Sequence, residues 1–293
     1  MYRLNSATTS AAHSFVKTSH RVYRDIRLGL LPSIYHAFRI RGSLHRTTYV
    51  GISVLAFALI LLAWMGAASA NLFSDTFPPS PIKVTQSFWQ WLTANALLFD
   101  VGISIFRVTL GFLIAAVIAV PLSLLIATFR PIQAFFEPFI EFIRYIPAVA
   151  FVPLVLLWVG IGEASKITII WIGTFFQMVL LLSEDVRRVP AAQIEAAETM
   201  GATRGEVLAR ILFRSALPNM VDTLRVTLGW AWTFLVVAEL VAANSGIGYA
   251  ILKAQRFLQT EKIFAGILLI GLLGLVMDQG FRFIHRRLFP WLY

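Results

Sequence analysis

The sequence contains no cysteine and few histidines. The absence of cysteine among its 293 residues excludes disulfides and thiol chemistry, but it leaves the cellular compartment open. The five histidines all lie in the terminal regions, at His13, His20, His36, His45 and His285. They cannot form a metal or acid–base centre in the middle of the chain, so we expect neither a metal site nor a catalytic residue.

Charged residues are scarce as well. Only 14% of the residues are charged and 58% are hydrophobic, whereas average soluble domains are roughly a quarter charged and about half apolar. This balance predicts an integral membrane protein. The net charge of +10 comes from basic residues that flank apolar stretches rather than from one patch, so we expect membrane lipid and no nucleic acid as a partner. No GxxxxGK[ST] motif occurs, which excludes ATP binding through that loop.

The first 46 residues form a basic N-terminal extension. They carry eight Lys or Arg and one acidic residue, Asp25. Phe15, Val22, Ile26 and Leu30 share one helical face, which is typical of an amphipathic helix in the membrane interface. The same composition fits a transit peptide or a disordered tail. A cleaved secretory signal is not expected, because the first long apolar stretch begins only near residue 49.

Residues 47–293 contain six apolar stretches that predict six membrane spans. Their approximate ranges are 49–68, 102–129, 145–160, 167–183, 221–242 and 263–283. If the N-terminus is cytoplasmic, the inner segments carry 17 Lys or Arg residues and the outer segments five. By the positive-inside rule, both termini and the loop at about 184–217 are then cytoplasmic. We therefore expect an all-α, multi-pass membrane domain that follows the basic extension.

Residues 195–218 form a polar segment within this apolar chain. The alanine-rich stretch 191–200 predicts a short helix, which Gly201 can end in the left-handed conformation. Thr203 and Glu206 have capping-box spacing, so a second short helix should start at once, at an angle to the first. Small alanines let another surface approach closely, while Glu195 offers its carboxylate to donors. We expect this segment to fit into a cleft of a partner protein.

The spacing in this segment resembles the EAA motif of importer permeases in the ATP-binding cassette (ABC) superfamily. The motif reads Glu-Ala-Ala, three residues, Gly, nine residues, Ile, and the matching residues are Glu195, Ala196, Ala197, Gly201 and Ile211. The Leu-Pro expected two residues beyond the Ile is replaced by Phe213-Arg214, and a Leu-Pro follows only at 217–218. This departure leaves the end of the second helix open.

Other stretches of residues 75–293 look like the importer group for taurine, alkanesulfonates, nitrate and bicarbonate. They are FPPSPIKV (77–84), SIFRVTLGF (104–112), WVGIGEASKI (158–167), VVAELVAANSGIGY (236–249) and RRLFPW (286–291). The resemblance implies a type I ABC importer permease fold in a bacterial inner membrane, with the permease as a homodimer. It also implies two ATP-binding subunits, which hold ATP and Mg and dock on the cytoplasmic loop, and a soluble or lipid-anchored substrate-binding protein. The permease itself would then hold no cofactor.

Four charged residues near or within the predicted spans are candidates for the substrate pathway, because charge at membrane depth is costly and usually functional. They are Arg107, Glu141, Arg144 and Glu239. Arg107 is expected near the outer interface, where it either extends to water or lines the pathway. Glu239, near the outer end of its span, faces either the pathway or solvent. Glu137, Glu141 and Arg144 share a helical face near the inner mouth, either as a structural ion network or as the exit for an anion.

From these features we predict a permease subunit that forms one half of a homodimeric pathway for a small anion and is driven by ATP bound to other subunits. The alternative is a self-sufficient channel or secondary transporter, which would need no ATPase. The sequence shows neither an internal repeat nor a strongly charged relay within the membrane, which disfavours that alternative. A membrane enzyme is a more distant possibility, because no catalytic constellation is present.

Overall fold

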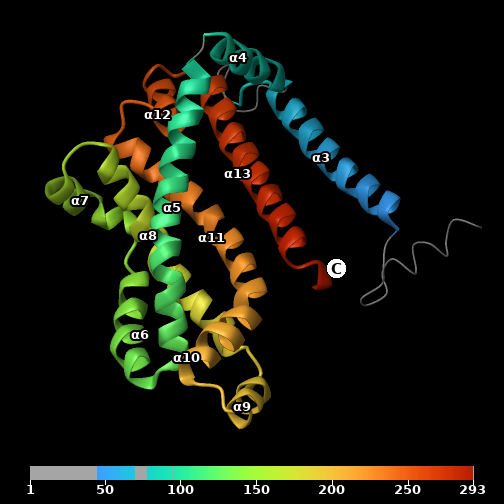
Figure 1. Ribbon diagram of the computed structural model, residues 1–293. Helices are drawn as coiled ribbons and strands as arrows, with labels where there is room; N and C mark the ends of the chain where they lie inside the picture. The colour runs from blue at the N-terminus through green and yellow to red at the C-terminus, as the bar shows by residue number, and fades with distance from the viewer. Residues whose placement is uncertain (1–44, 70–77, 95, 293) are drawn as a thin grey trace, which may run out of the picture. The chain divides into compact units, whose positions relative to one another are not determined.

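The computed structural model describes residues 45–69, 78–94 and 96–292. The predicted basic extension therefore lies outside the described residues, apart from its last two positions. The chain divides into two units, residues 1–66 and 67–293, and each is described by itself. All regular elements within the described ranges are helices (Figure 1), as the sequence predicts.

The described part of the first unit consists of helix α3 (Arg46–Ser69), which continues three residues past the boundary between the units. Its 24 residues carry no charge after Arg46. At a rise of about 1.5 Å per residue the helix is roughly 36 Å long, which exceeds the ~30 Å hydrocarbon core of a bilayer. The first predicted span is thus confirmed.

The second unit is a bundle of helices, with α4 and α12 at one end and α9 at the other (Figure 1). Its elements are α4 (Pro81–Thr93), α5 (Ala96–Thr128), α6 (Arg130–Arg144), η1 (Ala148–Phe151), α7 (Val152–Val159), α8 (Glu163–Arg187), α9 (Ala191–Thr199), α10 (Arg204–Glu206), η2 (Val207–Leu212), α11 (Phe213–Ala242), α12 (Ile247–Arg256), α13 (Thr260–Leu288) and η3 (Pro290–Leu292). The long apolar helices α5, α8 and α13, and the continuous stretch from α10 through α11, are each able to cross a membrane.

The prediction of one continuous third span at residues 145–160 is wrong. The chain there turns after α6, forms the short 3₁₀ helix η1 and continues as α7, so that the α6 segment and the η1–α7 segment meet at an angle of 93°. Pro147 causes the break, because proline restricts the residue before it and cannot continue the hydrogen-bonded ladder of a helix. This pair counts as a sixth span only as a broken one.

The prediction of two short helices in the polar segment is half correct. Helix α9 is short and separate, but the second helix does not end near Leu217-Pro218. It continues from Arg204 through the π-helical turn η2 into α11, and Pro218 lies inside α11. A proline in the interior of a long helix is tolerated here because neighbouring helices hold α11 on several sides.

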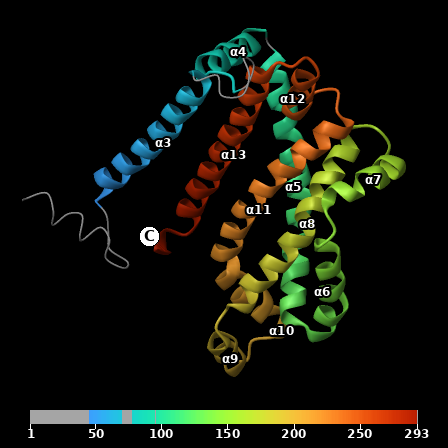
Figure 2. The ribbon, with the colours of Figure 1, turned by 180° about the vertical axis from the view of Figure 1, so that it is seen from behind.

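The core of the second unit lies where α5, α8 and α11 pack together, and α13 packs along α11 on the far side (Figures 1 and 2). Buried alanines, among them Ala115, Ala119, Ala231 and Ala238, line these contacts. Small residues bring helices close enough for the van der Waals packing that holds them together in lipid, where water does not drive them together.

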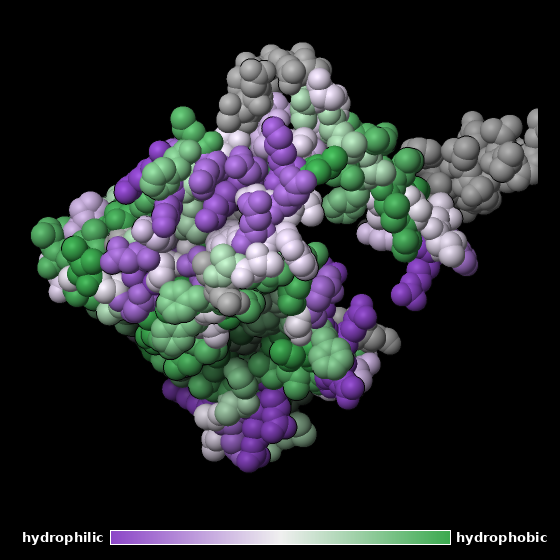
Figure 3. Space-filling view, turned by 90° about the horizontal axis from the view of Figure 1, so that it is seen from above, coloured by the Kyte–Doolittle hydropathy of each residue, from purple (hydrophilic) through white to green (hydrophobic). Residues whose placement is uncertain are grey.

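Two glycines allow the closest helix contacts. At Gly111 of α5, an added Cβ would lie 2.9 Å from the Ile170 side chain of α8. At Gly173 of α8, an added Cβ would lie 2.3 Å from the ring of Phe234 of α11. The three core helices therefore depend on glycine at the points where they cross. Seen from the end with α4 and α12, the second unit shows a group of hydrophilic side chains next to a hydrophobic surface (Figure 3).

Replacing Gly111 by Ala tests this contact. The new Cβ would press on Ile170 and, at 3.1 Å, on the carbonyl oxygen of Ile167, which is backbone and yields little. We expect the free energy of unfolding to fall by about 1–3 kcal/mol. Gly102 lies on the same helix with no atom within 4 Å of its added Cβ, so Gly102→Ala should be neutral or stabilising by about 0.5–1 kcal/mol. Thermal unfolding of both variants in detergent measures the difference, and equal melting temperatures would contradict it.

Candidate functional site

The polar segment begins with helix α9 and a tight turn. Gly201 has a φ of +84°, the left-handed conformation expected of it. Its amide donates to the Glu198 carbonyl at 2.9 Å, and the amide of Ala202 donates to the Ala197 carbonyl at 3.0 Å. The predicted capping box is also confirmed: the Thr203 amide donates to the Glu206 carboxylate at 3.0 Å, and the Glu206 amide donates to the Thr203 hydroxyl at 3.4 Å. These local bonds fix the angle between α9 and α10.

The residues that match the EAA motif fall on two sides of the segment. Glu195, Ala196 and Gly201 are exposed, whereas Ala197 is buried and Ile211 is half-buried. Ala197 and Ile211 pack into the core with Leu212 and Val207, so they attach the segment to the membrane helices. Within the described part of the chain, the Glu195 carboxylate has no hydrogen bond or ion pair. An exposed face of small residues with an unpaired acid is thus presented outward.

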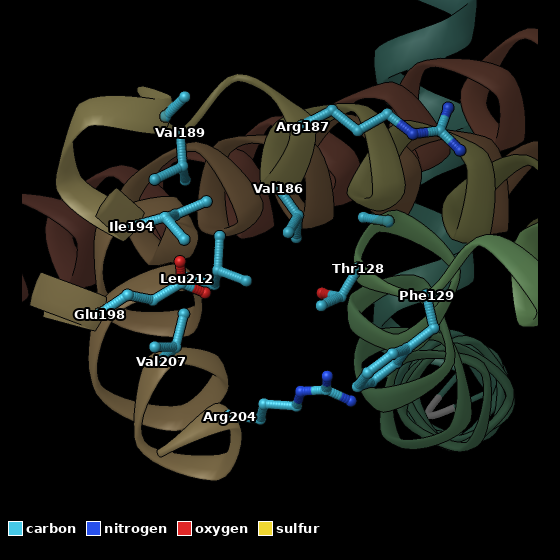
Figure 4. Close-up of a pocket in the computed structure, with 12 residues that line it drawn as sticks. Thr128, Phe129, Val186, Arg187, Val189, Ile194, Glu198, Arg204, Val207 and Leu212 are labelled. Carbon is cyan, nitrogen blue, oxygen red and sulfur yellow. The ribbon is translucent and has the colours of Figure 1, made fainter. Parts of the chain in front are cut away.

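A cavity of about 530 Å³ lies beneath this segment. It is lined by residues from the ends of α5 and α8 and by Ile194, Glu198, Arg204 and Val207 of the segment (Figure 4). The close-up shows Glu198 and Arg204 extending into the cavity from one side, with Thr128 and Phe129 across from them. Helices α9 and α10 are therefore not packed tightly against the end of α5, and they have room to shift relative to it.

At the opposite end of the second unit, Arg107 of α5 is the centre of a buried ion cluster. Its side chain is 0% exposed. Nε donates to Glu163 at 2.6 Å, and Nη2 donates to Glu163 at 2.7 Å and to the Ser245 hydroxyl at 3.2 Å. Nη1 donates to Glu239 and to the Ser245 carbonyl, both at 2.7 Å. A guanidinium has five N–H donors, and all five are used.

Glu239, at the end of α11, holds the following loop as well as Arg107. Its side chain is 0% exposed, and it accepts hydrogen bonds from the Ser104 hydroxyl at 2.8 Å and the Gly248 amide at 2.7 Å. A Cβ added to Gly246 would lie 2.3 Å from the Glu239 carboxylate, and a Cβ added to Gly248 would lie 2.8 Å from the Glu239 side chain. The backbone thus approaches Glu239 as closely as it does only because both positions are glycine. The cluster ties α5, α8, α11 and the start of α12 together.

These contacts exclude the water-exposed alternative for Arg107 and for Glu239. Arg107 does not extend to water, and Glu239 is not a solvated helix end, because both side chains are fully buried. In this conformation Arg107 has no N–H left for a transported anion. Burial also explains why Arg107 and Glu239 are fully paired. Removing a charge from water costs several kcal/mol, and only pairing with complete hydrogen bonding offsets that cost.

The predicted trio of Glu137, Glu141 and Arg144 does not act as one group. Glu137 pairs with Arg187 of α8 at 2.9 Å. Glu141 is exposed and has no ion pair among the described residues. Arg144 lies at the end of α6, about 10 Å further along the helix than Glu137, and it lines a cavity beside the middle of α8. The prediction that all three lie near the inner mouth is therefore wrong for Arg144.

Several members of the ion cluster are not evident from the sequence. Asp100, Ser104 and Arg107 lie at helical spacing on one face of α5, and Asp100 accepts from the Gly246 amide at 2.9 Å. Glu163 and Lys166, which pair at 2.8 Å, stand within the stretch WVGIGEASKI. The i, i+3 spacing was a signal for that pair, but nothing in the sequence indicated its contact with Arg107. Over the described ranges, no three His, Cys, Asp or Glu side chains are grouped as metal ligands would be.

Solved structures define the class of this fold. A chain of the MetNI methionine ABC transporter in an inward-facing conformation matches with a TM-score of 0.57 and 20% sequence identity, covering 69% of this chain and 97% of that one. A second crystal form of MetNI gives a TM-score of 0.52 at 21% identity and covers 64% and 97% of the two chains. The second unit therefore has the helical fold of a type I ABC importer membrane subunit.

Residues 119–290 match the family model described as binding-protein-dependent transport system inner membrane component, and the chain belongs to this family. Among its relatives, the taurine transport system permease protein TauC of Escherichia coli is 31% identical over 87% of this chain and 95% of its own length. The aliphatic sulfonates transport permease protein SsuC of Bacillus subtilis is 32% identical over 80% and 85%. The nitrate import permease protein NrtB of Synechocystis is 25% identical over 80% and 88%. The resemblance to this permease group is confirmed, and the chain is a transmembrane permease subunit of an importer.

Replacing Glu239 by Gln tests the ion cluster. The variant keeps the shape of the side chain but leaves the buried Arg107 with one carboxylate partner fewer, and we expect the free energy of unfolding to fall by about 3–5 kcal/mol. Glu184→Gln is the matched control, because Glu184 is exposed and lies 3.8 Å from Arg188. Such a surface pair contributes only about 0–1 kcal/mol. Thermal unfolding in detergent compares the two, and similar small losses would show that the cluster contributes little.

Proposed function

We propose that two copies of this chain form the membrane pathway of an ATP-driven importer for a small anion of the sulfonate, taurine, nitrate or bicarbonate class. Two ATP-binding subunits dock on the segment from α9 to η2, and a soluble or lipid-anchored binding protein delivers the anion to the opposite end. ATP and Mg are held by the partner subunits. The names of the relatives support this choice of substrate, since they are permeases for sulfonates, taurine and nitrate.

One observation carries the proposal. The exposed face of α9 consists of small and acidic residues, and the chain after α9 continues as one unbroken helix into the membrane helix α11. Helix α10 runs through η2 into α11 without a break. The Ser215 hydroxyl of α11 donates to Gln193 of α9 at 2.9 Å, which links the two arms. A force on Glu195 and Ala196 would therefore reach α11 directly, and the cavity beneath α9 leaves room for the movement.

The distribution of basic residues supports a cytoplasmic position for α9. The end of the second unit that carries α9 also holds Arg187, Arg188, Arg204, Arg210 and Arg214 within or beside the segment. By the positive-inside rule this end faces the cytoplasm, where an ATPase can reach it. The chain's N- and C-termini would then both be cytoplasmic.

The composition of the purified complex tests the proposal. We expect native mass measurement of the detergent-solubilised complex to give two permease chains and two ATPase chains. Reconstituted with the binding protein, this complex should take up taurine, butanesulfonate or nitrate only when ATP is present. A complex with one permease chain, or uptake by the permease alone, would instead support a self-sufficient transporter.

Replacing Gly201 by Val tests the docking segment. The left-handed φ of Gly201 is strained for a β-branched residue by about 1–3 kcal/mol, although no atom lies within 4 Å of the added Cβ. The turn would open and change the direction of α9. We expect normal membrane levels but loss of the co-purified ATPase. Gly205→Val is the control, since Gly205 is equally exposed and open but lacks a positive φ. Retention of the ATPase by Gly201→Val would contradict the docking assignment.

A further inference from the structure

A second cavity, of about 220 Å³, lies at the bend between α6 and α7. Its lining includes Arg144, Pro147, Gly173, Phe176, Gln177 and Phe234. Three of these residues stand near the middle of α8, because Gly173 follows ten residues after Glu163 and precedes Arg187 by fourteen. These separations correspond to roughly 15 Å and 21 Å along the helix. The cavity is therefore at membrane depth, far from both ends of α8.

The cavity holds a cationic side chain with an unused donor. The Nε of Arg144 is buried and has no hydrogen-bond partner among the described residues. Its Nη2 donates to the Tyr145 hydroxyl at 3.1 Å, and the guanidinium lies 4.8 Å from the Tyr145 ring centroid. No carboxylate pairs with Arg144 in the described part of the chain. A buried, unpaired donor on an arginine is costly, and an anion would remove that cost.

Gln177 supplies the second polar side chain of the cavity. It lies one helical turn beyond Gly173 on α8, it is half-buried, and within the described ranges its amide has no hydrogen bond. An amide group can donate two further hydrogen bonds to the oxygens of an anion. Arg107 differs sharply from this pair, because its five donors are all used by the protein itself.

The remaining walls are apolar. Phe151, Phe176, Phe234 and Ile172 line the cavity together with the chain at the bend. The absence of a side chain at Gly173 lets the Phe234 ring pack directly on α8 and form one wall. The volume is below the ~300–1,000 Å³ of sites for drug-sized ligands, yet it is several times the ~30 Å³ that one water occupies in the liquid. Such a space suits a small molecule with one oxyanion group and a short apolar part.

We propose that this cavity is an oxyanion subsite on the transport pathway, in which Arg144 and Gln177 bind the sulfonate group of a short aliphatic sulfonate and the aromatic walls contact its carbon chain. The inference rests on the proposed import of a small anion and names its substrate class. A sulfonate is favoured over nitrate because nitrate has no apolar part to fill the aromatic side of the cavity.

Uptake by the complete transporter in proteoliposomes is the first test. Arg144→Gln and Gln177→Leu should each lower butanesulfonate uptake at least about tenfold, because each removes a hydrogen bond to a charged group, while the amount of assembled complex stays unchanged. Phe176→Ala should lower butanesulfonate uptake more than nitrate uptake. Arg130→Gln, an exposed arginine at the start of α6, is the control and should leave uptake unchanged. Normal uptake by both Arg144→Gln and Gln177→Leu would overturn the subsite.

The lack of cysteine in the chain allows a second test that needs no transport. In Gln177→Cys, the only thiol of the permease would react with 2-sulfonatoethyl methanethiosulfonate, which is anionic, faster than with the trimethylammonium reagent, which is cationic. Butanesulfonate should slow the reaction, and adding Arg144→Gln should remove the preference for the anionic reagent. Gln255→Cys, exposed on α12, should show neither effect. Equal rates with both reagents and no slowing by butanesulfonate at Gln177→Cys would overturn the proposal.

The two tests separate failure of the subsite from failure of the proposed function. If the wild-type transporter takes up none of the three anions, the proposed function fails, and the thiol reaction still decides whether the cavity binds a sulfonate. If the wild type takes up butanesulfonate and the Arg144 and Gln177 variants do so equally well, the subsite alone fails.

Discussion

The ion pair between Arg107 and Glu239 is the interaction on which one end of the helical bundle depends. Both side chains are fully buried in an apolar protein, where a charge is stable only when it is paired; Glu239 pairs with Arg107, and Arg107 pairs with Glu163 as well. Once paired, they fix the surrounding backbone: Glu239 also binds the Gly248 amide, and Ser104 joins the carboxylate to the Ile247 amide. Helices α5, α8 and α11 are thus joined through buried charges at the α4/α12 end, whereas at the other end Thr223 of α11 donates to Asp185 of α8 and Arg187 of α8 pairs with Glu137 of α6.

This asymmetry is relevant to transport. At the end with α9, a cavity of about 530 Å³ separates the segment α9–α10 from α5, whereas at the opposite end Arg107 uses all five of its N–H donors. The cavity leaves room for α9 and α10 to shift relative to α5, while the ion cluster holds α5, α8 and α11 together at the opposite end. The unbroken helix from α10 into α11 would transmit a force applied at α9 along the second unit. The π-helical turn η2 lies where α10 continues into the membrane helix α11. Such turns occur frequently at functional sites.

Arg107 and Arg144 show that two arginines at membrane depth can have different roles. Arg107 uses all its donors within the protein and, in this conformation, has none left for a ligand. Arg144 keeps a buried donor unused beside a cavity, next to Gln177. The two arginines differ in the number of N–H donors that remain free. Their sequence positions do not distinguish them, because both stand in apolar stretches with acidic residues at helical spacing.

The sequence by itself determined the membrane class, most of the spans and the local structure of the turn between α9 and α10. These features follow from short-range physics: about 20 apolar residues span a bilayer, a glycine accepts a positive φ, and Thr203 and Glu206 cap a helix three residues apart. The bend at residues 145–160 was missed, because composition alone does not show that the apolar stretch after Pro147 turns by 93°.

Only the tertiary structure decided which charges meet. Arg107 and Glu239 are 132 residues apart, and Arg107 and Glu163 are 56 apart. No periodicity connects such positions, since their contact depends on how three helices pack. The same holds for Arg144 and Gln177, which share a cavity only because the bend before α7 brings the end of α6 beside the middle of α8. Patterns within one helix determine its face and its ends, whereas the pairing of buried charges is a property of the packed bundle.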